Sequence, residues 1–235
     1  MSRSATSYST TARSTEDRLA SANLYRPPFP RLPHISTRST VKRVIDVLGA
    51  CVGLAILGVL FVPTAIAIRL DSKGSILYSQ QRFGLQGKPF RIWKFRSMVS
   101  NADALKASIK NEAEGLIFKN TQDPRITRVG SFLRKTSLDE FPQFWNVLKG
   151  DMSLVGTRPP TADEVSQYSE RHWQRLDVRP GLTGQWQVSG RSEIKDFEEI
   201  VNLDLHYQRH WTPMYDVKLL FKTVVTILSK GSGAC

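Results

Sequence analysis

The sequence predicts an α+β fold that is mostly helical and is organised around one membrane-inserted helix. Three observations support this class. A long apolar run without charges is followed directly by two strand-like runs around a Gly-rich connection, and amphipathic helical patterns cover much of the remaining chain. The chain has 235 residues, 40% of them hydrophobic, which is enough to build a substantial core.

The net charge is strongly positive, because 33 Lys and Arg residues outnumber 21 Asp and Glu residues and give +12. A charge of this size favours an anionic partner, whether a nucleic acid, an anionic membrane or a phosphorylated substrate. The two cysteines cannot build a disulfide framework, and without a Cys/His cluster a structural zinc site is not expected.

Residues 1–40 have the composition of a disordered basic tail. They contain 14 Ser or Thr residues and a proline cluster at 27–33, and residues 1–43 contribute +6 of the net charge. Such a segment cannot bury enough apolar surface to offset the entropy of ordering. No apolar run follows the first basic residues, so we do not expect a secretory signal.

The apolar run covers 22 residues from Val47 to Ile68 and contains no charged side chain. A helix of this length can cross the hydrocarbon layer of a membrane, which is ~30 Å thick. Pro63 lies inside the run and lacks the N–H that would bond to the carbonyl four residues back, so we expect the helix to bend there. Basic residues flank both ends, which leaves two topologies open: a kinked spanning helix, or a helix that returns to the same face.

The segment after the apolar run predicts a β-hairpin, because residues 76–83 and 90–96 are rich in aromatic and β-branched side chains. Phe90, Ile92 and Lys94 are expected to share one face of the second strand. Helical periodicity predicts further helices over 98–118, 137–149, 161–175, 196–210 and 214–229. The last helix is basic and amphipathic, so it either lies on the membrane surface or packs into the core.

Two adjacent carboxylates, Asp139 and Glu140, follow Ser137 with the S-x-x-E spacing of a helix capping box. By itself this pattern is more often structural, since acidic residues complement the dipole of a first helical turn. Many cations accompany the pair: Lys94, Arg96, Arg125, Arg128, Arg134, Arg158, Arg179 and Arg191. Arginines in loops grip phosphate oxygens in bidentate fashion. Carboxylates among cations stay ionised, which suits a nucleophile or a metal ligand better than a general acid.

Seven motifs follow one another in order across residues 40–230. They are KRVID at 42–46, LDSKG at 70–74, QRFG at 81–84, FRIWKFRSM at 90–98, RKTSLDEFPQ at 134–143, GDMSLVGTRP at 150–159 and RPGLTGQWQVSGR at 179–191. With them the chain resembles the bacterial sugar transferase family, the monotopic polyprenyl-phosphate phosphoglycosyl transferases of capsule, exopolysaccharide and glycoprotein assembly. The resemblance implies the compact form of that family behind a basic tail.

The resemblance implies an enzyme that transfers a sugar-1-phosphate from a UDP-sugar to polyprenyl (undecaprenyl) phosphate with Mg²⁺, as the first step of glycan assembly. It places catalysis on Asp139 and Glu140. Asp139 would carry the covalent phosphosugar intermediate, and Glu140, together with Asp139, would hold or orient the Mg²⁺. The cations implied to bind substrate phosphates are Arg134 and Arg158, with Lys94, Arg96 and Arg191 lining the pocket.

The resemblance also implies a re-entrant membrane helix-hairpin over 41–72, broken at Pro63, which puts the whole fold on the cytoplasmic face of the bacterial inner membrane. A cytoplasmic transferase domain would then cover 73–230, with a flexible C-terminus at 231–235. Members of the family often have Ser-Pro at the break, whereas Val62 precedes Pro63 here.

Other interpretations stay open from the sequence. The lipid phosphate could attack the UDP-sugar directly while the carboxylates only bind metal, or the chain could be a membrane-tethered scaffold with a degenerate site. Nucleic-acid binding is disfavoured, because no recognition motif accompanies the high pI and the apolar run argues for a membrane. The sequence leaves open whether the sugar is glucose, galactose or an N-acetylhexosamine, and whether the chain forms a homodimer.

Overall fold

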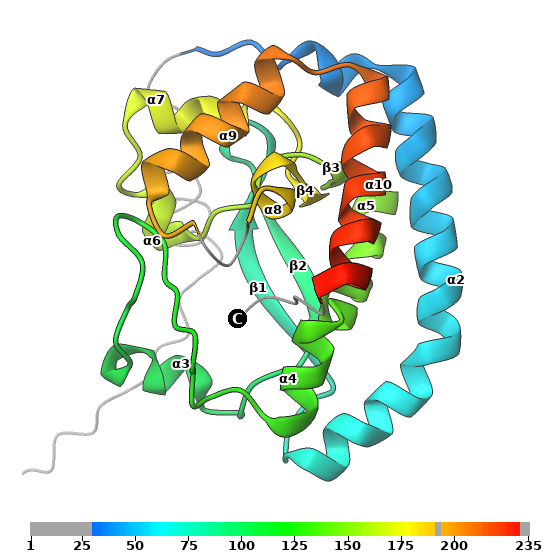
Figure 1. The fold of residues 1–235 in the computed structure, drawn as a ribbon, viewed down its shortest axis with the longest axis vertical. Helices are drawn as coiled ribbons and strands as arrows, with labels where there is room; N and C mark the ends of the chain where they lie inside the picture. The colour runs from blue at the N-terminus through cyan, green and yellow to red at the C-terminus, as the bar shows by residue number, and fades with distance from the viewer. Residues whose placement is uncertain (1–29, 191–193, 231–235) are drawn as a thin grey trace, which may run out of the picture.

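The computed structural model describes residues 30–190 and 194–230, and helices dominate this part of the chain (Figure 1). The α-helices are α2 (Thr40–Asp71), α3 (Ala102–Leu105), α4 (Arg128–Lys135), α5 (Phe144–Lys149), α6 (Ala162–Val165), α7 (Glu170–Trp173), α8 (Gln185–Val188), α9 (Phe197–Arg209) and α10 (Pro213–Lys230). The 3-10 helices are η1 (Ile35–Arg38), η2 (Leu85–Gly87), η3 (Lys106–Ser108), η4 (Leu138–Gln143) and η5 (Gln174–Asp177). The strands are β1 (Leu77–Phe83), β2 (Pro89–Phe95), β3 (Ser153–Val155) and β4 (Gly181–Thr183). The predicted class, α+β and mostly helical, is confirmed.

Two small sheets lie in the described chain. The predicted hairpin is confirmed, since β1 and β2 pair antiparallel from Leu77 opposite Phe95 to Phe83 opposite Pro89. The parallel pair β3 and β4 was not expected, because three-residue strands leave no measurable alternation in a sequence. The close approach of the two segments requires glycine, because a Cβ on Gly181 would lie 2.1 Å from the backbone nitrogen of Gly156.

The predicted helices fare unequally. Those at 196–210 and 214–229 are confirmed as α9 and α10. The predicted helix over 98–118 is wrong: α3 and η3 end at Ser108, and an irregular loop follows with Gly115 at positive φ. The predicted helix over 161–175 is interrupted, because Thr161 and Ser169 each cap the N-terminus of a separate short helix.

The predicted disordered tail over 1–40 is wrong for its last eleven residues. Residues 1–29 lie outside the described residues, as does the predicted flexible C-terminus over 231–235. From Pro30 the chain is folded against η5, where Arg31 forms an ion pair of 2.6 Å with Asp177. The backbone N–H of His34 also donates to the carbonyl of Asp177 over 2.8 Å. Composition does not reveal a partner that lies about 140 residues away.

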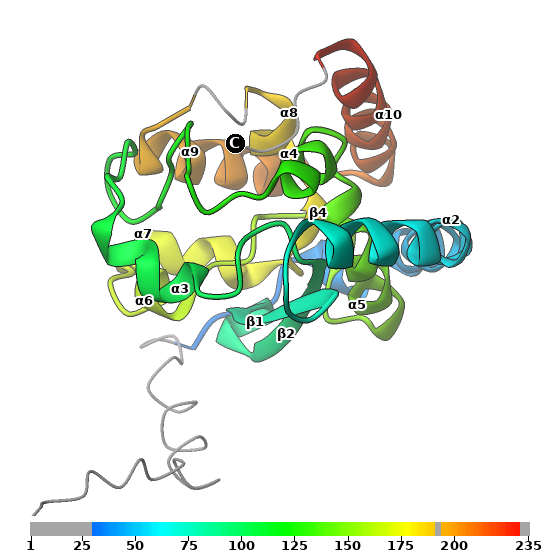
Figure 2. The same cartoon turned by 90° about the horizontal axis from the view of Figure 1, so that it is seen from below.

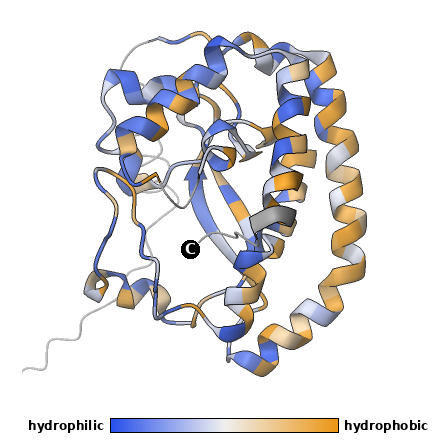
Figure 3. Ribbon diagram, in the orientation of Figure 1, coloured by the Kyte–Doolittle hydropathy of each residue, from blue (hydrophilic) through white to orange (hydrophobic). Residues whose placement is uncertain are grey.

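Helix α2 is the one helix of the described residues that is long and apolar enough to cross a membrane. Hydrophobic positions follow it along most of its length (Figure 3). One face, at spacings of three and four, leaves large apolar side chains exposed: Val41, Val44, Leu48, Val52, Ile56, Val59, Val62, Ile66 and Leu70. A continuous exposed apolar surface of this kind marks a membrane or protein contact.

The opposite face of α2 packs on the globular body. Along its length α2 contacts α10, β3, α5, η4 and α4. Figures 1 and 2 show α2 at the edge of the molecule, with its C-terminal part bending under the body. Pro63 lies inside this continuous helix and supplies the physical cause of a bend.

Both ends of α2 are attached to the same body. Near the N-terminus, the ammonium of Lys42 lies 2.6 Å from a carboxylate oxygen of Asp216 on α10, and both side chains are buried. At the C-terminus, the carboxylate of Asp71 accepts a hydrogen bond of 2.9 Å from the backbone N–H of Val129 on α4. The apolar helix therefore starts and finishes on one globular unit.

Glycines allow the close approach of α2 to the body. A Cβ on Gly49 would lie 2.5 Å from Cδ1 of Leu154 in β3, and one on Gly53 would lie 2.4 Å from the ring of Phe144 in α5. Gly58, in the same helix, has no atom within 4 Å of such a Cβ. Gly49 and Gly53 thus lie at the contact with the body, whereas Gly58 faces open space.

We expect Gly53→Ala to lower the thermal unfolding temperature of the detergent-solubilised protein, because overpacking a tight contact costs about 1–3 kcal/mol. Gly58→Ala is the matched control. It should leave the unfolding temperature unchanged or raise it, since alanine is favoured over glycine in a helix. Equal shifts for the two variants would contradict the tight contact of α2 with Phe144.

Candidate active site

The carboxylate pair lies on a 3-10 turn rather than at the start of an α-helix. Asp139 and Glu140 belong to η4, which α5 follows from Phe144. The predicted capping box is wrong, because Ser137 adopts a left-handed conformation with φ 57° and its side chain caps nothing. A non-glycine residue in this region costs on the order of 1 kcal/mol, and such strain concentrates at functional sites.

The pair opens into a cavity formed by segments far apart in the sequence. The hairpin, η4, the loop over 117–125, the residues after β3, β4 and α8 all contribute to its wall. The charged side chains in the wall are Arg82, Lys94, Lys119, Asp123, Arg125, Arg134, Asp139, Glu140 and Arg158. Asp139 is buried, so its carboxylate is enclosed among cations rather than exposed at a helix end.

The register of the hairpin directs two cations into this cavity. Tyr78 pairs with Lys94 and Gln80 pairs with Ile92, so the even-numbered residues of both strands share one face. Arg82 and Lys94 both lie on that face. The ammonium of Lys94 lies 2.9 Å from a carboxylate oxygen of Glu140, which ties the strand to η4.

Arg82 contributes positive charge to an already cationic wall. Its guanidinium donates to the carbonyl of Pro159 over 3.0 Å. Burial and the neighbouring charge of Arg158 lower the pKa of Arg82 to about 10. Arg82 therefore remains charged near neutral pH, close to a second guanidinium, and an anion bound between them would relieve the repulsion.

Arg158 is held in place by Glu164 of α6. Its guanidinium lies 2.8 Å from one carboxylate oxygen of Glu164 and 3.1 Å from the other. Burial alone would raise the pKa of Glu164, but the charge and hydrogen bonds of Arg158 outweigh it and hold that pKa below its ordinary value. The pairing fixes the direction from which Arg158 reaches the cavity.

The structure brings together most of the residues that the sequence predicted. Arg134, Arg158 and Lys94 line the same cavity as Asp139 and Glu140. Arg134 reaches it from α4 and donates from Nε to the hydroxyl of Ser97 over 2.9 Å.

Two predicted residues are not placed in this cavity. The prediction for Arg96 is wrong: its guanidinium donates to the carbonyls of Lys73 over 2.6 Å and Ser72 over 2.7 Å, where it closes the C-terminus of α2. Gly74 at φ +125° makes room for it, since a Cβ there would lie 2.1 Å from the guanidinium. Arg191 lies outside the described residues.

Sequence reasoning missed Arg82 as a site residue, although the hairpin register contains the signal. It also missed α8, which contributes Trp186 and Gln187 to the wall. The role of Asp123 was missed as well: its carboxylate grips Arg125 at 2.7 Å and fixes that guanidinium at the cavity. An Asp-x-Arg spacing is too common in sequences to have suggested this pair.

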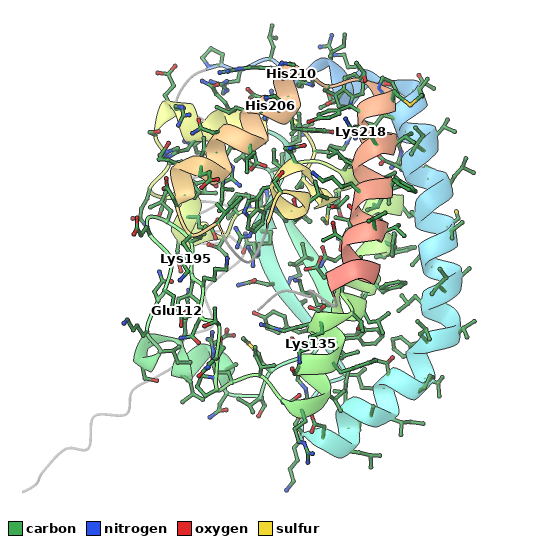
Figure 4. The ribbon with its side chains drawn as sticks, viewed as in Figure 1. Glu112, Lys135, Lys195, His206, His210 and Lys218 are labelled. Atoms are coloured by element: carbon green, nitrogen blue, oxygen red, sulfur yellow. The ribbon has the colours of Figure 1, made fainter. Side chains whose placement is uncertain are left out.

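The donor set bears on metal binding. Among the residues that the structure describes, no three His, Cys, Asp or Glu side chains gather into a metal cage. The described histidines do not line the cavity. His206 of α9 and His210, the residue after α9, lie near one another and well away from α4, where Lys135 is labelled (Figure 4). Mg²⁺ is usually held by one or two carboxylates together with substrate phosphates, and not by a cage of protein ligands alone. The carboxylates of Asp139 and Glu140 fit that pattern.

Buried Asp139, the partly buried Glu140 beside it, a wall of arginines and an adjoining long apolar helix together characterise this part of the molecule. Comparison with known proteins gives the family. Residues 37–230 match the bacterial sugar transferase family, and the chain belongs to it.

Several relatives have names that describe their activity. A galactosyl transferase CpsE of Streptococcus agalactiae is 49% identical over 82% of this chain and 43% of its own length. A UDP-glucose:undecaprenyl-phosphate glucose-1-phosphate transferase of Escherichia coli is 38% identical over 84% of this chain and 42% of its own length. The exopolysaccharide production protein ExoY of Sinorhizobium fredii is 40% identical over 81% of this chain and 87% of its own length. The chain thus spans less than half of the first two relatives and most of the third.

The ion pair of Arg158 and Glu164 predicts a pH dependence. A carboxyl whose pKa is depressed in the fold stabilises the protein above its unfolded pKa, and this contribution is lost as the pH falls through the folded pKa. We expect Glu164→Gln to unfold at a lower temperature than the parent at pH 7. The difference should shrink as the pH falls below the ordinary value of 4.5.

Glu199→Gln, at an exposed position of α9, is the control and should show a much smaller difference at every pH. Thermal unfolding between about pH 3.5 and 7 measures both variants. A difference for Glu164→Gln that stays constant across this range would show that the carboxylate of Glu164 is not held by Arg158.

Proposed function

We propose that the chain transfers a sugar-1-phosphate from a UDP-sugar to polyprenyl (undecaprenyl) phosphate at the cytoplasmic face of the bacterial inner membrane, as the first step of glycan assembly. The observation that carries the proposal is the buried Asp139 among arginines, beside a helix with an exposed apolar face. The names of the relatives from Escherichia coli and Streptococcus agalactiae support the reaction class.

In the proposed reaction, an oxygen of the Asp139 carboxylate attacks the sugar-linked phosphorus of the UDP-sugar. The bond from that phosphorus to the bridging oxygen breaks, and UMP leaves with this oxygen. A phosphate oxygen of the lipid then attacks the same phosphorus and displaces the carboxylate. Asp139 is restored, and the product is a polyprenyl diphosphate sugar. Two displacements at one site suit a carboxylate nucleophile that stays ionised.

The cations of the wall have distinct tasks in this scheme. Arg82, Arg134 and Arg158 would bind the oxygens of the diphosphate and hold it in line with Asp139. Lys94 would keep Glu140 directed into the cavity through their ion pair. Mg²⁺ bound by Asp139, Glu140 and the substrate would neutralise charge on the departing UMP.

Direct displacement by the lipid phosphate is the second candidate mechanism. It would require both phosphates to occupy the cavity together, whereas the covalent route lets them use it in turn. The enclosure of Asp139 within the cavity favours the covalent route, because the carboxylate is already placed against the cations that would bind the donor.

We propose that α2 is re-entrant and does not span the membrane. Lys42 near one end and Asp71 at the other are both bound to one globular body. Placing those ends on opposite sides of a bilayer would require that body to cross the hydrocarbon. A bend at Pro63 with the apolar face in one leaflet avoids that cost.

Asp139→Asn should abolish transfer to undecaprenyl phosphate and should also abolish UMP release when no acceptor is present. The amide is a poor nucleophile but fills the same volume. Asp163→Asn, at an exposed carboxylate of α6, is the control and should behave like the parent. A panel of UDP-sugars, with UMP and lipid product measured separately, provides the assay. Retained turnover by Asp139→Asn would exclude Asp139 as the nucleophile.

The topology can be tested with single cysteines in a Cys51→Ser, Cys235→Ser background. Ile35→Cys and Lys73→Cys, both at exposed positions, should react with a membrane-impermeant maleimide from the same side of sealed vesicles. Adding Pro63→Leu should restore the missing backbone hydrogen bond but leave both labels on the same side, because the contacts of Lys42 and Asp71 hold both ends of α2 on one body. Labelling of the two cysteines from opposite sides without that substitution would exclude a re-entrant α2.

A further inference from the structure

A second cavity, which we call the apolar groove, lies between α10 and the η4–α5 segment. Its lining is mainly apolar and comes from several elements: Phe141, Phe144, Leu154, Leu182, Val188, Leu220, Val224 and Ile227. The chemistry proposed above does not use these side chains.

The apolar groove adjoins the charged cavity. Glu140, Leu182 and Gln187 belong to the walls of both. A ligand that filled the groove would therefore reach the carboxylate pair with one end. Since Glu140 belongs to both walls and the arginines only to the charged cavity, this end would lie beside Glu140 and face the arginines.

The apolar groove also lies directly behind the membrane helix. Its residues Phe144 and Leu154 are the side chains against which Gly53 and Gly49 of α2 pack. On the other side, α10 lies next to α2 and carries exposed apolar side chains at Val217, Phe221 and Val225 (Figure 1). The groove thus borders two helices, α2 and α10, whose outer faces carry exposed apolar side chains.

The position of α10 over the groove is fixed by a polar contact. The hydroxyls of Thr183 in β4 and Thr223 in α10 lie 2.8 Å apart. Lys222, at an exposed position of the groove wall, adds a cation on the same helix. The groove therefore combines an apolar interior, a cation at its wall and a charged cavity at one end.

We propose that the apolar groove holds the first isoprene units of the polyprenyl phosphate, with the lipid phosphate directed past Glu140 into the charged cavity. This inference rests on the proposed function. An isoprenoid chain has no hydrogen-bonding groups, so it matches a lining of Leu, Val, Ile and Phe side chains. A sugar or a peptide in the same place would leave hydroxyl or backbone groups without partners.

Under this proposal, α10 determines which acceptor lipid binds, and the charged cavity binds the sugar donor. With its first isoprene units in the groove, the lipid would hold its phosphate above the bilayer surface. The rest of the polyprenyl chain would stay in the leaflet. Gly49 and Gly53 of α2 pack against side chains of the groove wall, so membrane attachment and acceptor binding would depend on the same contact.

Two neighbouring valines of α10 provide a matched test. Val224 lines the groove and is 54% exposed, whereas Val225 is 44% exposed and does not line it. Val224→Trp should raise the KM for undecaprenyl phosphate by about tenfold, because the larger side chain would take the space of part of the isoprenoid chain. The KM for the UDP-sugar should stay within about twofold of the parent, and Val225→Trp should change neither constant.

A second measurement keeps the test decisive if Val224→Trp fails to fold. In the Cys51→Ser, Cys235→Ser background, Val224→Cys should lose maleimide reactivity in micelles when undecaprenyl phosphate is added, and Val225→Cys should not. This readout needs no turnover, so a chain that binds the lipid without transferring sugar would refute the proposed function and not the groove.

Three outcomes would contradict the proposal that the groove binds the acceptor lipid. Equal effects of the two tryptophan substitutions would show that the acceptor does not contact this face of α10. Equal protection of the two cysteines would show the same. Protection of Val224→Cys by phosphatidylglycerol to the same degree as by undecaprenyl phosphate would mean that the groove holds bulk lipid.

Discussion

The close packing of α2 on the globular body is the constraint on which the rest of the structure depends. Gly49 and Gly53 let the helix backbone approach Leu154 and Phe144, and these side chains in turn support β3 and α5. Because η4 runs directly into α5, the position of the carboxylate pair follows from how α2 is seated. Helix α2 is therefore part of the scaffold of the site.

Charge pairing at the end of α2 reinforces this arrangement. Burying Lys42 and Asp216 removes both groups from water, which is costly unless the geometry is good and further hydrogen bonds are made. Those bonds are present: Lys42 also donates to the carbonyl of Val155, and Asp216 accepts from Tyr207 and Trp211. Such a network specifies one position of α2 relative to β3 and α10.

The charged cavity contains both cations that are paired with carboxylates and a cation, Arg82, that is hydrogen-bonded to neutral oxygens. Arg125 and Arg158 are oriented by Asp123 and Glu164, so their carboxylate partners set direction as well as charge. Arg82 instead donates to the carbonyl of Pro159 and to the side-chain oxygen of Gln80, and it lies close to Arg158. A diphosphate would supply the negative charge that this wall lacks, while the apolar groove would supply the environment that its lipid partner needs.

The sequence was sufficient for the parts of this account that depend on local pattern or on shared motifs. The apolar run, the hairpin, α9 and α10 follow from periodicity, and the motif around Asp139 identifies the family. Arg96 shows the limit: a motif lists its residues, but not that this guanidinium turns towards the carbonyls of Ser72 and Lys73, just after α2, instead of the cavity. Arg82 shows the reverse, because its contribution depends on strand register.

Other features depend on tertiary contacts that no local pattern contains. The left-handed conformation of Ser137 defeats a capping-box pattern that is otherwise well formed. The parallel pairing of β3 and β4 joins strands too short to be detected, and it needs glycine at 156 and 181. Residues 30–39 fold because Asp177 is available to Arg31, which composition cannot reveal.

The central claim, that Asp139 accepts the sugar phosphate before the lipid does, is tested most directly by the mass of the intact protein. Incubation with a UDP-hexose in the absence of lipid should add one hexose phosphate, and the peptide containing Asp139 should carry it. Undecaprenyl phosphate should then remove the added mass. An unmodified protein that nevertheless turns over donor and acceptor together would contradict a covalent intermediate.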